Sequence, residues 1–238
     1  MGSGLMGSNA RREMLAIDDN RMEVFLDMPS GGGPFPAVIV AHHRAGIDAA
    51  TTKFVQDLAA NGYVAVAPDL HHRRPEGEDT KESLQNLNDV QIIGDINSVV
   101  SFLQNKDLVD SERLGIAGHC MGGRVSFLGA ASIKAIKCNV VYYGGNMFVS
   151  WGGGNETPFD MLESLRGPVI GFFGEDDENP SPRDVTKIGT RLTELDVEHE
   201  FHSYEGCGHA FQNFTNPQGY RAAATADSFE KMISWLAR

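Results

Sequence analysis

Short apolar runs that alternate with helix-forming segments set the tightest limit on the fold of this chain. Predominantly apolar runs of four or five residues occur at 37–41, 63–67, 113–117, 140–143 and 169–173. Strands that are apolar on both faces are typical of parallel sheets, because helices cover both sides of such a sheet. Between and after these runs, apolar residues recur at helical spacing, most clearly over 84–103 and 229–236. The sequence therefore predicts an α/β fold with parallel βαβ units and helices on both faces of a mostly parallel sheet.

The remaining segments extend this pattern without a break between domains. Residues 21–26 alternate polar and apolar groups, which predicts a half-exposed strand near the sheet edge, and residues 198–203 alternate as a last strand. A helix over 181–195 is expected to begin at Ser181, with Pro182 as its first residue and Asp184 as the reciprocal carboxylate of the cap. Residues 1–8 look like an added tag. Because no linker or repeat divides the rest, we expect one domain over 9–238.

Charge and cysteine content restrict the class of protein. The 238 residues include 32 acidic and 20 basic side chains, and the net charge of −12 argues against a nucleic-acid partner. No apolar segment is long enough to span a bilayer and no signal-type start is present, so no membrane partner is expected. The three cysteines cannot all pair, and none has a CxxC or zinc-site spacing. Reduced thiols and a cytoplasmic location are therefore expected, while the oligomeric state cannot be predicted.

Residues 118–123, with the sequence GHCMGG, contain the motif most closely tied to chemistry. They follow the apolar run at 113–117 and precede a helix-forming stretch at 124–131, which is the context of a nucleophile elbow. Such a turn strains the backbone of its central residue, so its neighbours must be small, and Gly118 and Gly122 stand two residues either side of Cys120. A helix N-terminus also lowers the pKa of a thiol. Cys120 is the candidate nucleophile, although a glycine-rich turn with an incidental buried cysteine would give the same pattern.

Two later motifs supply the partners that a nucleophile needs. Asp176 and Asp177 directly follow the apolar run at 169–173, and open α/β sheets place their sites beyond the carboxyl ends of strands. His209 lies between small residues in a loop after the last predicted strand, where a proton carrier has room to move. Nucleophile, acid and histidine stand in the chain order of α/β-hydrolases. The three motifs together predict an α/β-hydrolase fold with a catalytic triad, in which either aspartate could be the acid.

The chain resembles the dienelactone hydrolase (carboxymethylenebutenolidase) family from about Val38 to the C-terminal helix. The resemblance implies that Cys120 is the nucleophile, His209 its base and Asp177 the acid, because the family's acid stands three residues after a glycine. It implies hydrolysis of a small-molecule ester or lactone through a thioester. This mechanism requires no metal or organic cofactor. The matching segments are residues 42–46, 68–70, 118–123, 174–182 and 204–211.

The resemblance also assigns roles around the nucleophile. It implies an oxyanion hole made by the backbone N–H groups of Arg44 and Met121, and a substrate carboxylate bound by Arg73. Two positions depart from family members that open dienelactone. His43 stands where they have a glutamate that helps to activate the thiol, and Asn213 stands where they have a second carboxylate-binding arginine. We therefore expect His43 to contact the substrate, and the resemblance does not extend to dienelactone itself.

Two other functions are compatible with the sequence. His42, His43, His71 and His72 all follow buried strands and should gather near Asp69 at one sheet edge, where they could form the site of a metal-dependent hydrolase. The same histidines could instead line the pocket mouth or hydrogen-bond its loops. The chain could also be a binding protein that kept the fold without chemistry. A protein without chemistry, however, has no physical need for a complete triad.

Overall fold

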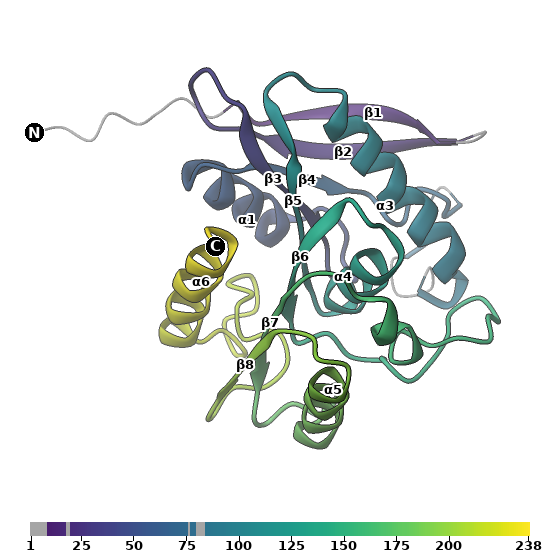
Figure 1. Cartoon of the computed structure of the whole chain (residues 1–238), viewed down its shortest axis with the longest axis vertical. Coiled ribbons are helices and arrows are strands. Elements are labelled where there is room, and N and C mark those ends of the chain that lie inside the picture. The colour runs from purple at the N-terminus through teal and green to yellow at the C-terminus, as the bar shows by residue number, and fades with distance from the viewer. Residues whose placement is uncertain (1–8, 18–19, 76, 80–83) are drawn as a thin grey trace, which may run out of the picture.

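The computed structural model describes residues 9–17, 20–75, 77–79 and 84–238, so the tag predicted at residues 1–8 lies outside the described part of the chain. Its strands are β1 (Arg11–Ile17), β2 (Asn20–Asp27), β3 (Phe35–Ala41), β4 (Val64–Pro68), β5 (Val109–His119), β6 (Ile136–Tyr142), β7 (Val169–Gly174) and β8 (His199–Tyr204). They form one eight-stranded sheet in the order β1-β2-β4-β3-β5-β6-β7-β8 (Figure 1). β1 pairs antiparallel with β2 and β2 antiparallel with β4, while the other pairings are parallel. The predicted mostly parallel sheet is confirmed.

Helices cover both faces of this sheet (Figure 1). α1 (Ala49–Ala60) and α6 (Ala222–Leu236) lie on one face, and α3 (Asp89–Gln104), α4 (Met121–Ser132) and α5 (Pro182–Glu194) lie on the other. Two short 3-10 turns, η1 (Leu84–Asn86) and η2 (Asp160–Ser164), precede α3 and β7. Each face has its own apolar core, because successive side chains of a strand point to opposite sides. Within the described residues, no helix is both long and apolar enough to cross a membrane.

Capping residues decide where two of these helices begin. The Ser181 hydroxyl accepts the N–H of Asp184 at 3.2 Å, and the Asp184 carboxylate accepts the N–H of Ser181 at 3.0 Å, so the cap predicted for α5 is confirmed. α3 begins later than the apolar spacing from Leu84 predicts. The Asn88 side chain accepts two N–H groups of the first turn, at 2.9 and 3.2 Å, and separates η1 from α3.

The sheet edge differs from the sequence prediction. Residues 21–26 are expected at the edge, but β1 pairs along the full length of β2 and forms the edge itself. Met22 and Val24 on β2 are therefore fully buried. β1 has few buried side chains. Antiparallel pairing with β2 stabilises this strand, and apolar periodicity alone does not mark such a strand.

Close backbone contacts surround the turn that joins β5 to α4. A Cβ atom on Gly118 would lie 1.9 Å from the Gly122 carbonyl oxygen, and a Cβ atom on Gly122 would lie 1.9 Å from the Ala41 carbonyl oxygen. Both obstacles are backbone atoms, which cannot yield without moving a strand or a helix. Glycine at these two positions lets the start of α4 approach the ends of β3 and β5.

We predict that Gly122→Ala lowers the free energy of unfolding by at least about 2 kcal/mol, because the new methyl group overlaps the β3 backbone. The matched control is Gly94→Ala in the middle of α3, where an added Cβ meets no atom within 4 Å. Gly94→Ala should stabilise the protein by about 0.5–1 kcal/mol through helix propensity. Urea unfolding of the two variants would measure this, and equal midpoints would contradict the packing argument.

Candidate active site

Cys120 lies at the tip of the turn between β5 and α4. Its backbone has φ 55° and ψ −118°, a conformation that residues with a side chain rarely adopt. The Cys120 N–H donates to the Tyr142 carbonyl at 3.0 Å, and the neighbouring His119 ring stacks on the Tyr142 ring with centroids 4.6 Å apart. These contacts hold the turn against β6. The strained turn presents the Cys120 side chain to the cavity above the sheet.

His209 and Asp177 meet beside Cys120, although 32 residues separate them along the chain. His209 Nδ1 lies 2.8 Å from Asp177 Oδ2, and the other Asp177 oxygen accepts the N–H of Asn179 at 2.9 Å. The Asp177 side chain is 3% exposed, whereas Asp176 is an exposed residue and does not line the cavity. Of the two aspartates left open by the sequence, Asp177 is the one that contacts His209.

Hydrogen bonding reverses the effect of burial on the pKa of Cys120. Burial alone would raise the thiol pKa, but hydrogen bonds with His209 and with the backbone N–H groups of Met121 and Arg44 lower it below its usual value. Burial likewise disfavours the charged His209 ring. Its hydrogen bonds with Asp177 and Cys120 nevertheless raise the His209 pKa to about 10. The pair therefore favours a thiolate beside an imidazolium ion.

The two N–H groups that contact the sulfur come from different segments. Met121 is the first residue of α4, and Arg44 lies in the loop between β3 and α1. Both N–H groups converge on the Cys120 sulfur. The resemblance implies the same two donors for an oxyanion hole, which stays a prediction.

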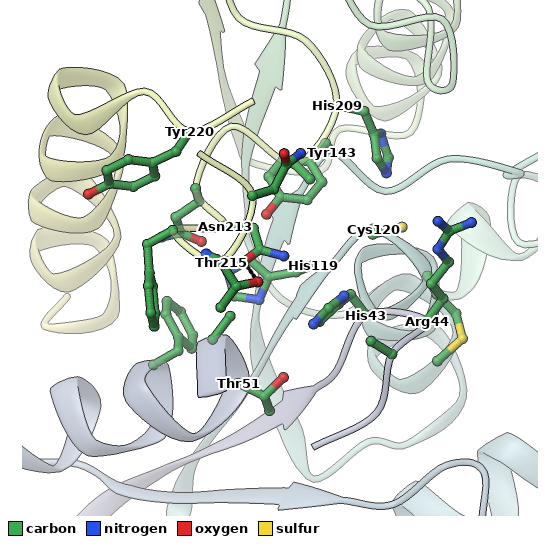
Figure 2. A pocket seen from close by; sticks show the side chains of 18 of the residues that line it. His43, Arg44, Thr51, His119, Cys120, Tyr143, His209, Asn213, Thr215 and Tyr220 are labelled. Atoms are coloured by element: carbon green, nitrogen blue, oxygen red, sulfur yellow. Dashed lines mark hydrogen bonds between the residues drawn. The ribbon is translucent and has the colours of Figure 1, made fainter. Parts of the chain in front are cut away.

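A cavity of about 1270 Å³ opens over these residues (Figure 2). One wall is apolar and includes Phe54 of α1 and Phe229 of α6, whose ring centroids are 6.0 Å apart. Thr51, Asn213 and Thr215 contribute polar groups to the lining. A concave apolar pocket with a few convergent polar groups is typical of a small-molecule site.

His43 lines this cavity and is paired with Asp48, an acid that the sequence reasoning missed. His43 Nε2 lies 2.9 Å from Asp48 Oδ2. Burial raises the pKa of Asp48, but the hydrogen bond with His43 and that with the Thr51 N–H lower it to about 2. The carboxylate is therefore charged at neutral pH and orients the His43 ring in the pocket. The sequence signal that could have identified Asp48 as the partner of His43 is that both residues lie close together in one loop.

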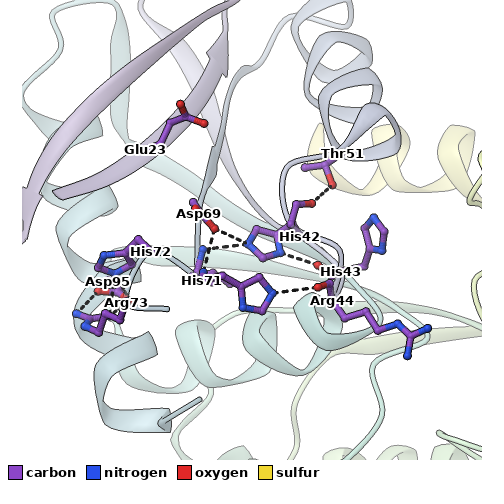
Figure 3. A network of polar contacts seen from close by, with 12 residues as sticks. Glu23, His42, His43, Arg44, Thr51, Asp69, His71, His72, Arg73 and Asp95 are labelled. Carbon is purple, nitrogen blue, oxygen red and sulfur yellow. Dashed lines mark hydrogen bonds and ion pairs between the residues drawn. The ribbon is translucent and has the colours of Figure 1, made fainter. Parts of the chain in front are cut away.

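The other predicted histidines hydrogen-bond the loops around the site (Figure 3). Burial lowers the pKa of His42 to about 4, so its ring is neutral. It accepts the N–H of Leu70 at 2.9 Å and bonds the His43 carbonyl at 2.6 Å. His71 Nε2 bonds the Arg44 carbonyl at 3.1 Å. In the described part of the chain, no group of three or more His, Cys, Asp or Glu residues could hold a metal ion. The metal-dependent alternative therefore lacks a ligand set there.

The structure does not bring Arg73 to the cavity. Its guanidinium bonds both carboxylate oxygens of Asp95 on α3, at 2.5 and 2.8 Å, and His72 bonds the same carboxylate at 3.1 Å (Figure 3). The Asp95 side chain is only 1% exposed. Burial raises its pKa, but the hydrogen bonds with His72 and Arg73 lower it below the usual range. This geometry does not support the substrate-binding role predicted for Arg73. Its partner lies on a helix 22 residues away, which a local motif cannot reveal.

The chain is similar in sequence and structure to known hydrolases. The model of the dienelactone hydrolase family matches residues 22–238. A Methylorubrum extorquens protein with the name carboxymethylenebutenolidase is 28% identical, over 93% of this chain and 78% of its own length. A Bradyrhizobium protein named as a 2-oxo-3-(5-oxofuran-2-ylidene)propanoate lactonase is 28% identical, over 89% of this chain and 87% of its own length. A dienelactone hydrolase crystal structure from Klebsiella pneumoniae is 27% identical and covers 98% of this chain and 99% of its own, with a TM-score of 0.90.

We predict that limiting iodoacetamide at pH 7 alkylates Cys120 more than about a hundredfold faster than Cys138. The pKa of Cys120 is lowered by its hydrogen bonds, while burial raises the pKa of Cys138 to about 12, so only Cys120 has an appreciable thiolate fraction. Burial also raises the pKa of Cys207, which is 3% exposed. Peptide mapping by mass spectrometry would measure all three rates. Faster labelling of Cys138 would contradict the assignment of Cys120.

We predict that Arg73→Ala lowers the free energy of unfolding by about 2 kcal/mol, because it leaves the buried Asp95 carboxylate with fewer hydrogen bonds. Arg74→Ala is the matched control, since Arg74 is an exposed residue of the same loop. It should change stability by less than about 0.5 kcal/mol. Urea unfolding compares the two variants. A stable Arg73→Ala protein with a raised KM for acidic esters alone would instead favour the role in substrate binding.

Proposed function

The chain belongs to the dienelactone hydrolase family, and we propose that it hydrolyses carboxylic esters or lactones through a thioester on Cys120. The observation that carries this proposal is the convergence of three groups on one sulfur. The His209 ring, held 2.8 Å from Asp177, and the N–H groups of Met121 and Arg44 all bond the Cys120 side chain. Nucleophile, base, orienting acid and oxyanion donors are the parts that acyl transfer requires.

Acylation begins with the Cys120 thiolate attacking the substrate carbonyl carbon. As the C–S bond forms, the carbonyl oxygen gains negative charge and accepts the N–H groups of Met121 and Arg44. Each such donor contributes about 3 kcal/mol to lowering the barrier. The C–O bond to the leaving alcohol then breaks, and the alkoxide takes the proton from the His209 imidazolium. In a lactone, this oxygen stays attached to the acyl group as a hydroxyl.

Deacylation uses the same groups with water as the nucleophile. Neutral His209 takes a proton from water as the water oxygen attacks the thioester carbon. The same N–H groups stabilise the second oxyanion, and the C–S bond breaks to release the acid and the thiolate. Asp177 holds His209 Nδ1 throughout, so Nε2 faces the reacting atoms in both steps.

Lactones are the substrate class that the comparisons favour. The names of the relatives refer to a butenolide and to an oxofuran lactone, both of them ring esters. The apolar wall at Phe54 and Phe229 can bury the carbon skeleton of such a compound. His43, paired with Asp48 beside the nucleophile, is positioned to contact its polar groups.

The test is turnover of a panel of lactones and of p-nitrophenyl acetate by the purified protein. Wild-type protein should hydrolyse members of the panel, and intact-mass spectrometry of the quenched reaction should detect one acyl group on Cys120. Cys120→Ala should remove both signals while keeping the fold. Absence of turnover by wild-type protein, or an undiminished rate for Cys120→Ala, would reject the proposal.

We predict that Asp177→Asn lowers kcat by about 10³–10⁴-fold, because His209 loses the partner that sets its tautomer and stabilises its charge. The pKa of His209 should also fall from about 10, since the Asp177 hydrogen bond raises it. Asp176→Asn is the matched control and should keep near wild-type kcat, because Asp176 is exposed and outside the cavity lining. Steady-state rates on one ester would compare them. The reverse ranking would assign the acid to Asp176.

A further inference from the structure

The backbone of Arg44 is held from both sides. Its N–H contacts the Cys120 sulfur, and its carbonyl oxygen is 3.1 Å from Nε2 of His71, a side chain only 2% exposed. The loop therefore cannot move the Arg44 Cα away from the nucleophile without breaking buried hydrogen bonds. The side chain that starts from this Cα lines the cavity, and Figure 2 shows it extending beside Cys120.

Within the part of the chain that the structure describes, the Arg44 guanidinium has no hydrogen bond or ion pair. Most other charged groups of the cavity are paired with one another. The pairs are His43 with Asp48, Lys53 with Asp57 and His209 with Asp177. The remaining carboxylate of the lining, Glu178, is an exposed residue without an ion pair among the described residues. Arg44, an exposed residue of the cavity lining, is thus a cation whose donors are available to a ligand.

We propose that the Arg44 side chain binds an anionic group of the substrate close to the scissile carbonyl. Its planar guanidinium presents paired N–H donors that match a carboxylate. The chain carries a net charge of −12, so an acidic substrate needs a local cation to overcome the repulsion of the whole protein. Arg73 bonds Asp95 and does not line the cavity, so its position does not favour it as that cation. The inference rests on the proposed hydrolase function and identifies the residue that selects its substrates.

The position of Arg44 limits where the anion stands in the substrate. The same residue supplies an oxyanion donor and the guanidinium, so the charge must lie within the reach of one arginine side chain from the carbonyl oxygen. Figure 2 shows Arg44 on the other side of Cys120 from Asn213 and Tyr220. The carboxylate therefore binds a few bonds from the scissile carbon, while the rest of the molecule extends toward Tyr220. A substrate with its charge at the far end would gain nothing from Arg44.

Iodoacetate and iodoacetamide test this site without requiring hydrolysis. They have nearly the same size and differ in charge. In both reactions, the Cys120 thiolate forms a C–S bond, the C–I bond breaks and iodide leaves, while the thiol proton stays on His209. The carboxylate of iodoacetate is one bond from the reacting carbon. The ratio of the two alkylation rates at Cys120 therefore reports recognition of a nearby anion.

Arg44→Met keeps the backbone donor and an unbranched apolar stem but removes the guanidinium and its charge. We expect it to lower the iodoacetate-to-iodoacetamide rate ratio about tenfold, the effect of losing one hydrogen bond to a charged group. Lys53→Met is the matched control. It removes one cation from the same cavity lining, but that cation is bonded to Asp57 at 2.5 and 2.6 Å, so the ratio should stay that of wild type.

The outcomes separate this inference from the proposed function. An unchanged ratio in Arg44→Met overturns the inference, even if both rates fall together, because equal losses mean that the arginine acts on the thiolate. An equal drop of the ratio in Lys53→Met also overturns it, because the effect would be one of net charge. Hydrolysis of a neutral ester is measured in parallel. Its absence rejects the proposed function, whereas a tenfold drop in the ratio still supports an anion site at Arg44.

Discussion

The strained backbone of Cys120 is the constraint on which the rest of the site depends. At φ 55°, this residue turns the chain sharply from β5 into α4, and the turn closes only because Gly118 and Gly122 let backbones touch. Closing it places Met121 at the start of a helix that packs against β3. The loop after β3 then brings the Arg44 N–H to the same sulfur. The backbone conformation of this one residue thus determines the positions of the nucleophile and of the N–H donors around it.

Charge pairing lowers the pKa of the Cys120 thiol in this acidic protein. Burial opposes the ionised thiol, yet the imidazolium of His209 and two N–H groups favour it more strongly. The histidines of the neighbouring loops do not compete for that charge. His42, whose pKa is lowered to about 4, is neutral. Its ring hydrogen-bonds both the loop after β3 and the loop after β4 and so connects them. The cluster that resembles a metal site in sequence therefore positions the loop that carries Arg44.

Much of the fold could be predicted because its strands are buried on both faces and its helices are amphipathic. The predictions fail where pairing or capping overrides periodicity. β1 is stabilised by antiparallel pairing with β2, and Asn88 starts α3 later than the apolar spacing indicates. In the site, Cys120 and His209 could be predicted because each lies in a short sequence motif that is recognisable without knowledge of the tertiary structure. Arg73 stands in such a motif too, but a carboxylate from α3 occupies its donors.

The sequence by itself determined the α/β architecture and the chain order of nucleophile, acid and histidine, because both depend on local patterns of apolar, small and polar residues. Only the tertiary structure decided which groups meet. It distinguishes Asp177 from its neighbour by burial and by the 2.8 Å contact with His209. It also pairs Arg73 with Asp95 and leaves the Arg44 side chain available beside Cys120. These outcomes depend on contacts between segments far apart in the chain, and hydrogen bonding between such segments leaves no local signature in the sequence.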